Sequence, residues 1–246
     1  MSSKRTSTQY ISIIFYLCII ACSLQGCKRE APQTNGGNAS LSTGIKKGHK
    51  EAGFSLYENG ENQEAIEELK QALADSPDDV EVYCKLASAY SDEEMTDDAI
   101  SMYKKAVELE PNHIGAHYDL GLFLIDNGMC DEGIAELRKV WELNPRYEDV
   151  SFTLGDAYYD CKKVDDAIAI WESLLKEDPD DKILHYNLGI AYRDKRQLDR
   201  ALSEAEKALA GDMRNADAKK LFRQLTAKKR SKGSGKSKKK REKKNH

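Results

Sequence analysis

Residues 114–147 read IGAHYDLGLFLIDNGMCDEGIAELRKVWELNPRY, and residues 182–215 read KILHYNLGIAYRDKRQLDRALSEAEKALAGDMRN. Aligned without a gap, the two segments share His-Tyr at positions 4 and 5 and Leu-Gly at positions 7 and 8. The same 34-residue period runs without insertion from Lys46 to Asn215 and yields five copies. Because a fixed period of this length is typical of stacked repeats, we take the repeat as the unit of the fold.

Within each copy the apolar positions fall into two stripes with helical spacing. Positions 4, 7 and 11 share one face of a first helix, and positions 20, 21, 24, 27 and 28 share one face of a second. Positions 8 and 20 are always Gly or Ala, which allows the two helices to cross closely. Position 32 is Pro in the first four copies and ends the second helix. Each copy is therefore predicted to be a helical hairpin, and the hairpins must stack to bury their apolar faces.

This pattern resembles the tetratricopeptide-repeat (TPR) family over 170 of the 246 residues. The resemblance implies an all-α fold, a right-handed α-solenoid of five 34-residue helix-turn-helix repeats with a concave side. Leu221, Phe222 and Leu225 share one helix face opposite basic residues, so residues 216–228 predict a C-terminal capping helix. Members of this family bind other proteins, which implies a protein-interaction module and not an enzyme. The predicted repeats are residues 46–79, 80–113, 114–147, 148–181 and 182–215.

The N-terminal region predicts an export signal. Two basic residues lie within the first five, and an uncharged apolar run of 13 residues follows, which is short for a membrane span. The run leads to LQGC at residues 24–27, which resembles the lipobox of bacterial lipoproteins, although Gln25 replaces the usual small or aliphatic residue. We expect a signal peptide over residues 1–26 and a lipid on Cys27. Lipidation of Cys22 and an uncleaved N-terminal anchor are the alternatives.

The resemblance also implies a location. By the sorting rule of many bacterial lipoproteins, Lys28 after the lipidated Cys implies the outer membrane, facing the periplasm. We therefore expect a lipid-anchored protein of the bacterial cell envelope, with residues 27–45 as a flexible tether because they are small and polar. A lipobox followed by such repeats is similar to the type IV pilus biogenesis lipoproteins. More loosely, it is similar to outer-membrane lipoproteins that assist barrel assembly or scaffold peptidoglycan enzymes.

The formal charge of −4 conceals two opposite blocks. Residues 46–215 carry 20 Lys/Arg and 39 Asp/Glu, whereas residues 216–246 carry 14 Lys/Arg and 2 Asp/Glu. Such asymmetry indicates charged partners. Residues 229–246 are polar throughout and predict a disordered Lys-rich tail. Three roles for the tail stay open: adhesion to an anionic lipid or envelope polymer, folding back on the acidic groove, or solubilisation. Nucleic acid is the least favoured ligand for an exported chain.

The candidate binding surface follows from the resemblance, which places positions 2, 5, 9, 12 and 13 of the first helices on the concave face. Position 13 is acidic in all five copies, although negative charge is disfavoured near the C-terminal end of a helix. A basic ligand and an ordinary solvated acidic face both explain these acids. Aromatic residues between them suit an extended peptide with basic and apolar side chains. The candidate groove residues are Glu58, Asp92, Asp126, Asp160, Asp194 and Asp156, with Tyr57, Tyr118, Phe152, Tyr159 and Tyr186.

Catalytic and metal-binding patterns are missing from the sequence. It contains no phosphate-binding Gly-rich loop, no HExxH and no paired-cysteine zinc spacing, so we expect no enzymatic activity and no cofactor. His49, His117 and His185 recur at intervals of 68 residues. They occupy the core-facing position 4 of alternate repeats, too far apart to share one ion, which favours packing over metal binding.

The cysteines beyond the signal region are Cys84, Cys130 and Cys161, an odd number. Cys130 and Cys161 both lie near the hairpin turns of adjacent repeats. Packed helices lie roughly 8–10 Å apart, whereas a disulfide requires Cα atoms within about 7 Å. Free thiols are therefore favoured over a Cys130–Cys161 bridge.

Overall fold

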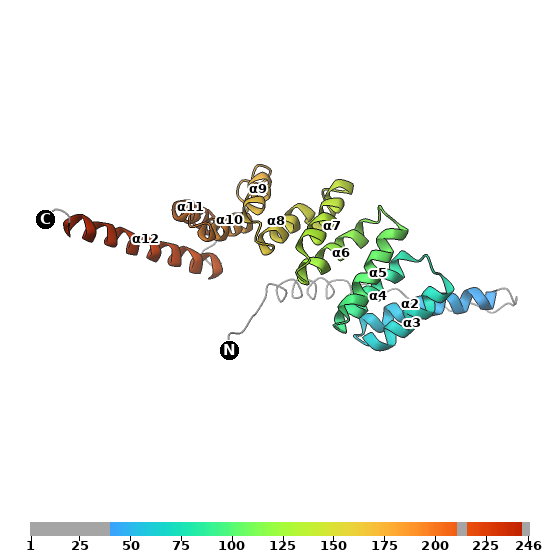
Figure 1. The fold of residues 1–246 in the computed structure, drawn as a ribbon. Coiled ribbons are helices and arrows are strands. Elements are labelled where there is room, and N and C mark those ends of the chain that lie inside the picture. The colour runs from blue at the N-terminus through green and yellow to red at the C-terminus, as the bar shows by residue number, and fades with distance from the viewer. Residues whose placement is uncertain (1–39, 211–215, 243–246) are drawn as a thin grey trace, which may run out of the picture. The chain divides into compact units, whose positions relative to one another are not determined.

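The computed structural model describes residues 40–210 and 216–242, and their side chains over residues 48–210 and 216–231. The chain divides into two units, Met1–Leu41 and Ser42–His246, and the second contains the repeats (Figure 1). No β-strand occurs in the described residues, whose helices form five consecutive pairs and a final single helix, which confirms the predicted fold class. The helices are α2 (Ser40–Glu58), α3 (Asn62–Asp75), α4 (Val80–Asp92), α5 (Thr96–Leu109), α6 (Ile114–Asp126), α7 (Cys130–Leu143), α8 (Val150–Asp160), α9 (Val164–Leu174), α10 (Lys182–Asp194), α11 (Leu198–Leu209) and α12 (Ala216–Glu242).

Every hairpin turn passes through the left-handed backbone region at position 15 of the repeat. Gly60 and Gly128 occupy this position in repeats 1 and 3, with φ of 80° and 78°. Glu94, Lys162 and Arg196 occupy it in repeats 2, 4 and 5, with φ of 60°, 62° and 59°. A side chain is disfavoured there by roughly 1–2 kcal/mol, so the packing of the two helices must impose this turn.

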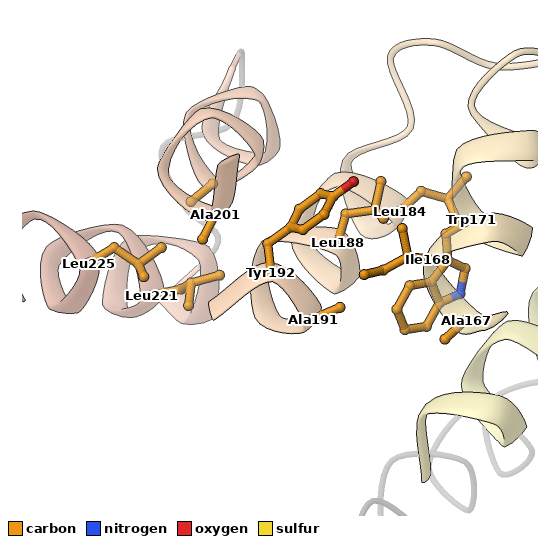
Figure 2. Packing of buried hydrophobic residues seen from close by; sticks show 11 residues of the cluster. Ala167, Ile168, Trp171, Leu184, Leu188, Ala191, Tyr192, Ala201, Leu221 and Leu225 are labelled. Atoms are coloured by element: carbon orange, nitrogen blue, oxygen red, sulfur yellow. The ribbon is translucent and has the colours of Figure 1, made fainter. Parts of the chain in front are cut away.

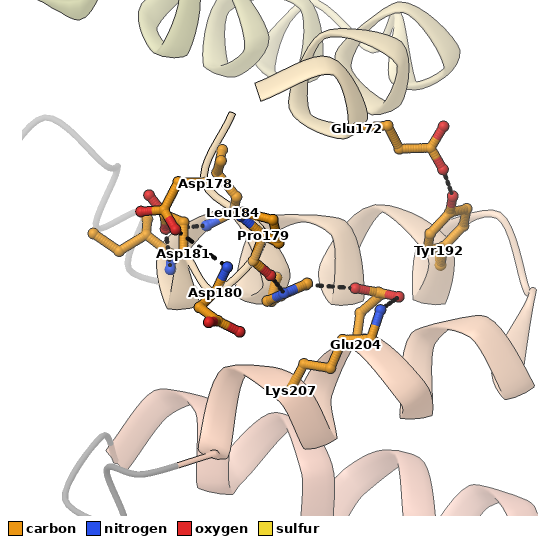
Figure 3. Close-up of polar contacts among 11 residues, drawn as sticks. Glu172, Asp178, Pro179, Asp180, Asp181, Leu184, Tyr192, Glu204 and Lys207 are labelled. Carbon is orange, nitrogen blue, oxygen red and sulfur yellow. Dashed lines mark hydrogen bonds and ion pairs between the residues drawn. The ribbon is translucent and has the colours of Figure 1, made fainter. Parts of the chain in front are cut away.

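Side-chain caps start the first helices of repeats 2, 3 and 5. Asp79, His113 and Asp181 each accept a hydrogen bond from a backbone N–H of the first turn, as Figure 3 shows for Asp181. These caps satisfy amides that have no partner within the helix. In repeat 4 a 3-10 turn, Tyr147–Asp149, precedes α8, which begins without a side-chain cap. The backbone at the junction of repeats 3 and 4 therefore differs from that at the other junctions.

Small residues allow the two helices of each hairpin to approach. The Ala residues at position 20 of repeats 1, 2, 4 and 5 are completely buried. In repeat 4 the indole of Trp171, which is 2% exposed, packs against Gly155, and a Cβ on that glycine would lie 2.6 Å from Cδ1 of the indole. Figure 2 shows Trp171 together with Ala167 and Ile168 of its own helix and Leu184 of α10. Each pair of adjacent repeats shares at least one such cluster of buried residues.

The histidines at position 4 join the two helices of their hairpins by hydrogen bonds. Nδ1 of His117 lies 2.5 Å from Oε2 of Glu136, and Nδ1 of His185 lies 2.7 Å from Oε2 of Glu204. Nε2 of each ring lies 3.0 and 2.9 Å, respectively, from the carbonyl oxygen of the Pro six residues upstream, which Figure 3 labels as Pro179 for repeat 5. Both nitrogens of each ring therefore have a hydrogen-bond partner, one on the second helix and one in the turn before the first helix.

The histidine and its glutamate recur together. Repeat 1 contains the same pair, His49 and Glu68, with 2.6 Å between Nδ1 and Oε2. Where position 4 is not His, position 23 is not Glu: repeat 2 has Tyr83 with Met102, and repeat 4 has Ser151 with Ile170. The packing interpretation missed this polar partner, which the co-occurrence of the two residue types would have revealed. Over the described side chains, no three His, Cys, Asp or Glu residues are grouped to hold a metal ion.

Both ends of the repeat region are more helical than the sequence suggested. Helix α2 begins at Ser40, so residues 40–45 of the predicted tether are helical. Helix α12 continues to Glu242, so most of the predicted disordered tail, residues 229–242, is helical as well. Once packing has formed a helix, each further residue adds a hydrogen bond at little cost, and Lys and Arg are good helix formers. Composition alone therefore did not predict that these two segments continue the neighbouring packed helices.

The preference for free thiols was wrong for two of the three cysteines. Cys130 and Cys161 form a disulfide between repeats 3 and 4, with their Cα atoms 5.7 Å apart. Cys161 lies in the hairpin turn that follows α8, and Cys130 directly follows the hairpin turn of repeat 3 as the first residue of α7. The turns of adjacent repeats approach more closely than the helix axes on which the prediction relied. Cys84 remains a thiol, and burial, followed by the charge of Asp119, raises its pKa to about 12.

Candidate partner-binding face

The five acids at position 13 each form the last residue of a first helix. All five are exposed, and they recur once per hairpin on helices α2, α4, α6, α8 and α10. We call the surface made by positions 2, 5, 9, 12 and 13 of these helices the first-helix face. The acids stand where the helix macrodipole is unfavourable to negative charge, so the helices themselves gain nothing from them. They are Glu58, Asp92, Asp126, Asp160 and Asp194.

The charge of Asp160 acts on two other carboxyl groups, one in repeat 3 and one in repeat 4. Burial, followed by the charge of Asp160, raises the pKa of Asp156 to about 7 and also raises the pKa of Asp126. Burial raises the pKa of Asp160 too, against the opposing charge of Lys162. Asp156 accepts a hydrogen bond of 3.2 Å from Nδ2 of Asn187 in repeat 5. This part of the face therefore contains three partly desolvated carboxyl groups whose ionisation is disfavoured.

The acids of repeats 2 and 5 have partners within the protein. Oδ1 of Asp194 accepts a 2.9 Å bond from Nε of Arg193, and Oδ2 accepts a 2.6 Å bond from the hydroxyl of Tyr159. Burial alone would raise the pKa of Asp194, but these two bonds outweigh it and lower the pKa. In repeat 2, burial and then the charge of Asp92 raise the pKa of Tyr57 to about 12. Asp194 thus binds a tyrosine of the preceding repeat, and the charge of Asp92 acts on another, Tyr57.

The five aromatic residues of the predicted groove are half-buried, because they also pack between repeats. The hydroxyl of Tyr118 lies 3.4 Å from Oγ1 of Thr153 in the next repeat, and its ring meets that of Tyr147 edge-on at 5.4 Å. Phe152 and Tyr186 pack against the core shared by repeats 4 and 5. Contacts between repeats therefore take up part of the surface of these rings.

A lysine outside the predicted groove residues lies over two aromatic rings of the first-helix face in repeat 1. Nζ of Lys85 lies 4.9 Å from the ring centroid of Tyr57 and 5.4 Å from that of Phe54, within cation–π range. Burial raises the pKa of Asp119 to about 6, and the charge of Lys85 opposes this shift. Lys85 stands at position 6, which the family pattern does not assign to the concave face. Its contacts with two aromatic rings of the preceding repeat depend on how the repeats stack, so the sequence pattern could not predict them.

The residues that predict export and lipidation, including Cys27 and the alternative Cys22, lie outside the described part of the chain. Among the helices that the structure describes, none combines the length and apolar character needed to cross a membrane.

Comparison with known proteins identifies the repeats. Family models of the TPR repeat and tetratricopeptide repeat match residues 53–93, 80–113 and 124–188. A crystal structure of MamA matches with 30% sequence identity and a TM-score of 0.57, over 64% of this chain and 92% of that chain. The protein belongs to the tetratricopeptide-repeat family. A second MamA structure matches this TPR protein with 29% identity and a TM-score of 0.60, over 67% of this chain and 90% of that chain.

More distant structures share the fold. YrrB, described as a TPR protein with an unusual peptide-binding site, matches with 23% identity and a TM-score of 0.60, over 74% of this chain and 90% of YrrB. PilF of Pseudomonas aeruginosa matches with 18% identity and a TM-score of 0.58, over 80% of this chain and 90% of PilF. No curated protein sequence matches the chain. TPR proteins are typically non-enzymatic scaffolds for protein–protein interaction, and the architecture of this chain is that of such a scaffold.

Proposed function

We propose that this TPR protein is a membrane-tethered scaffold or assembly factor that receives a partner protein or peptide on its first-helix face. The observation that carries the proposal is the column of five exposed acids at the ends of the first helices. Asp126, Asp156 and Asp160 gain most from a basic ligand, because its positive charge offsets the cost of burying their charges and the repulsion that Asp160 exerts on the other two.

The expected partner also carries apolar residues. Ile183 stands at position 2 of repeat 5 and is 60% exposed, on the same helix that ends at Asp194. The partly exposed ring of Tyr186 lies three residues further along this helix and therefore shares its side. A basic peptide with an apolar residue next to its Lys or Arg fits this arrangement of charge and apolar surface.

The first experiment compares capture of partners by the full chain and by two charge variants. The test variant replaces the five position-13 acids with their amides, and the control replaces five exposed acids on second helices with theirs. Both change the net charge equally, so a partner lost from the test variant and kept by the control supports the first-helix face. Equal capture by both variants means that the acids are an ordinary solvated surface. The control residues are Glu64, Asp98, Glu142, Asp166 and Glu206.

We further propose that the protein is exported and lipid-anchored on Cys27, in the outer membrane and facing the periplasm. The Cys130–Cys161 disulfide supports export, because disulfides persist in oxidising compartments such as the periplasm. Labelling with a radioactive fatty acid tests the anchor. We expect the label on the wild-type chain and on Cys22→Ser, and none on Cys27→Ser. Label retained by Cys27→Ser excludes this anchor.

An alternative function makes the C-terminal segment the working part, adhering to an anionic envelope polymer or lipid surface. It is favoured by helix α12, which continues to Glu242 and so presents the Lys-rich sequence on an ordered backbone. Deleting residues 229–246 from a Cys27→Ser chain separates the two functions. Loss of envelope retention on deletion supports adhesion, whereas retention independent of the deletion supports a partner bound to the repeats.

A further inference from the structure

A basic cleft lies between repeat 5 and helix α12. It has a volume of about 310 Å³ and is lined by Arg193, Arg196, Leu198 and Lys228. These residues come from the end of α10, the hairpin turn, the first residue of α11, and α12. Ligand pockets in proteins start at about 300 Å³, so the cleft suits a small chemical group rather than a large molecule.

The charge of the first-helix face reverses at this cleft. Helix α12 follows α11 as a sixth first helix would, and 34 residues after Asp194 stands Lys228 in place of a further acid. Lys229 binds Oδ1 of Asp199 at 2.8 Å and so holds α12 beside the start of α11. The column of acids therefore ends in a group of cations.

The acids near the cleft leave most of this positive charge uncompensated. Asp194 binds only Nε of Arg193 and shares its other oxygen with a tyrosine hydroxyl, so the terminal nitrogens of Arg193 are not used by that carboxylate. Among the side chains that the structure describes, neither Arg196 nor Lys228 takes part in an ion pair, and both are exposed. Two unpaired cations and a partly neutralised third therefore surround one cleft.

The backbone around this cleft resembles that of the other repeats. Arg196 holds the left-handed turn position, with φ of 59°, where repeats 1 and 3 have Gly. Arg196 places a long cationic side chain at this turn, as Lys162 does at the same position of repeat 4. Leu198 opens α11, whose first amides have no side-chain cap, but every second helix begins in this way. What distinguishes repeat 5 is the set of three cations.

We propose that this cleft binds a dianionic phosphate group. Guanidinium groups and an ammonium match phosphate oxygens through charge-assisted hydrogen bonds, and three surrounding cations suit a dianion better than a singly charged carboxylate. The phosphate belongs either to a soluble phosphorylated compound or to the monoester headgroup of a lipid. The cleft borders the first-helix face, because Arg193 at position 12 belongs to both, but the phosphate proposal does not rest on the proposed partner.

Calorimetric titration with inorganic phosphate tests the proposal. It uses the full chain in non-ionic detergent, against sodium chloride at the same ionic strength. The variants Arg196→Gly and Lys228→Gln each remove one cation, and Arg196→Gly is expected to fold well because its turn favours Gly. Each variant should weaken phosphate binding by about tenfold, the usual effect of losing one charge-assisted hydrogen bond.

Two control variants distinguish phosphate binding in the cleft from nonspecific attraction of phosphate to the positive charge of the protein. Lys162→Gly changes the same turn position in repeat 4, where φ is 62°, and the triple variant Lys238→Gln, Lys239→Gln, Lys240→Gln reduces the charge of the tail. Both should bind phosphate as the wild type does. The proposal is overturned if the wild type shows no phosphate binding beyond the chloride control. It is equally overturned if the Arg196→Gly, Lys228→Gln double variant binds as tightly as the wild type.

The source of the phosphate is then decided with two further probes. Glycerol phosphate represents a soluble compound, and phosphatidylcholine vesicles containing phosphatidic acid represent a lipid headgroup. Binding that the double variant loses for either probe supports the cleft and assigns the source. If the double variant retains the binding of both probes, the basic tail is responsible and the proposal fails.

Discussion

Replacing Gly155 with Ala tests how repeat 4 is packed. The new Cβ would lie 2.6 Å from Cδ1 of Trp171, and closer still to Nε1, so the indole has to move. That indole is 2% exposed and enclosed by the core of repeats 4 and 5. Overpacking of this kind costs roughly 1–3 kcal/mol, and the close contact with a rigid ring places Gly155→Ala at the upper end. Ala offsets about 1 kcal/mol through its better helix propensity, which leaves a net loss of about 1–2 kcal/mol.

The matched control is Gly189→Ala, at the same position of repeat 5. There the nearest atom to the new Cβ is Cδ2 of Leu221 at 3.1 Å, the end of a flexible side chain. We expect a change between no effect and a stabilisation of about 1 kcal/mol, since helix propensity dominates.

Urea unfolding of wild type and both variants, followed by circular dichroism at 222 nm, measures the difference. With unchanged slopes, the midpoint of Gly155→Ala should fall below that of the wild type and that of Gly189→Ala should not. In thermal unfolding the loss corresponds to roughly 2–8 °C for a chain of this size. A folded Gly155→Ala variant with a wild-type midpoint would refute the packing of Trp171 on Gly155.

Three further predictions concern polar and covalent contacts. The raised pKa of Asp156, about 7 in the folded protein, means that its carboxyl contributes stability below its unfolded pKa that is lost as pH rises through 7. Asp156→Asn should therefore melt at a higher temperature than wild type at pH 8, by at least about 2 °C, and at a similar temperature at pH 4. The Cys130–Cys161 disulfide spans 31 residues, so its removal by double Ser substitution should cost at most roughly 3–4 kcal/mol in urea unfolding. Glu136→Leu should cost about 1–3 kcal/mol in the same assay, because it leaves the buried ring of His117 without its carboxylate partner.

Each of these predictions has a control and a contrary result. Asp126→Asn changes the same charge at an exposed site and should show a smaller pH dependence than Asp156→Asn. Equal stabilisation of Asp156→Asn at pH 4 and pH 8 contradicts the raised pKa. Labelling with iodoacetamide should modify neither Cys130 nor Cys161 before reduction. Glu142→Leu, on the exposed side of the same helix as Glu136, should change stability by less than about 0.5 kcal/mol.

Individual residues show which features a sequence pattern can predict. The period of 34 residues, with Leu-Gly at positions 7 and 8 of three repeats, predicted the hairpins. It also placed acids such as Asp126 and Asp160 near the ends of first helices, where both are the final helical residue. The partner of His117 was within reach of the same reasoning, because Glu136 co-varies with it from repeat to repeat.

Contacts between repeats were not predictable in this way. The Cys130–Cys161 disulfide depends on how closely two turns approach, and the cleft of Arg196 and Lys228 depends on where α12 docks. The helicity of residues 229–242 depends on the packed helix from which they continue.

The sequence by itself determined the helical hairpins, their number and the column of acids, because helix formation and the spacing of side chains along a helix follow from local backbone geometry. Only the tertiary structure decided which acids have partners within the protein and which cysteines form the disulfide. It also decided where the charge of the first-helix face changes from negative to positive. These features depend on distances between repeats, and such distances result from the packing of side chains that are far apart in the chain.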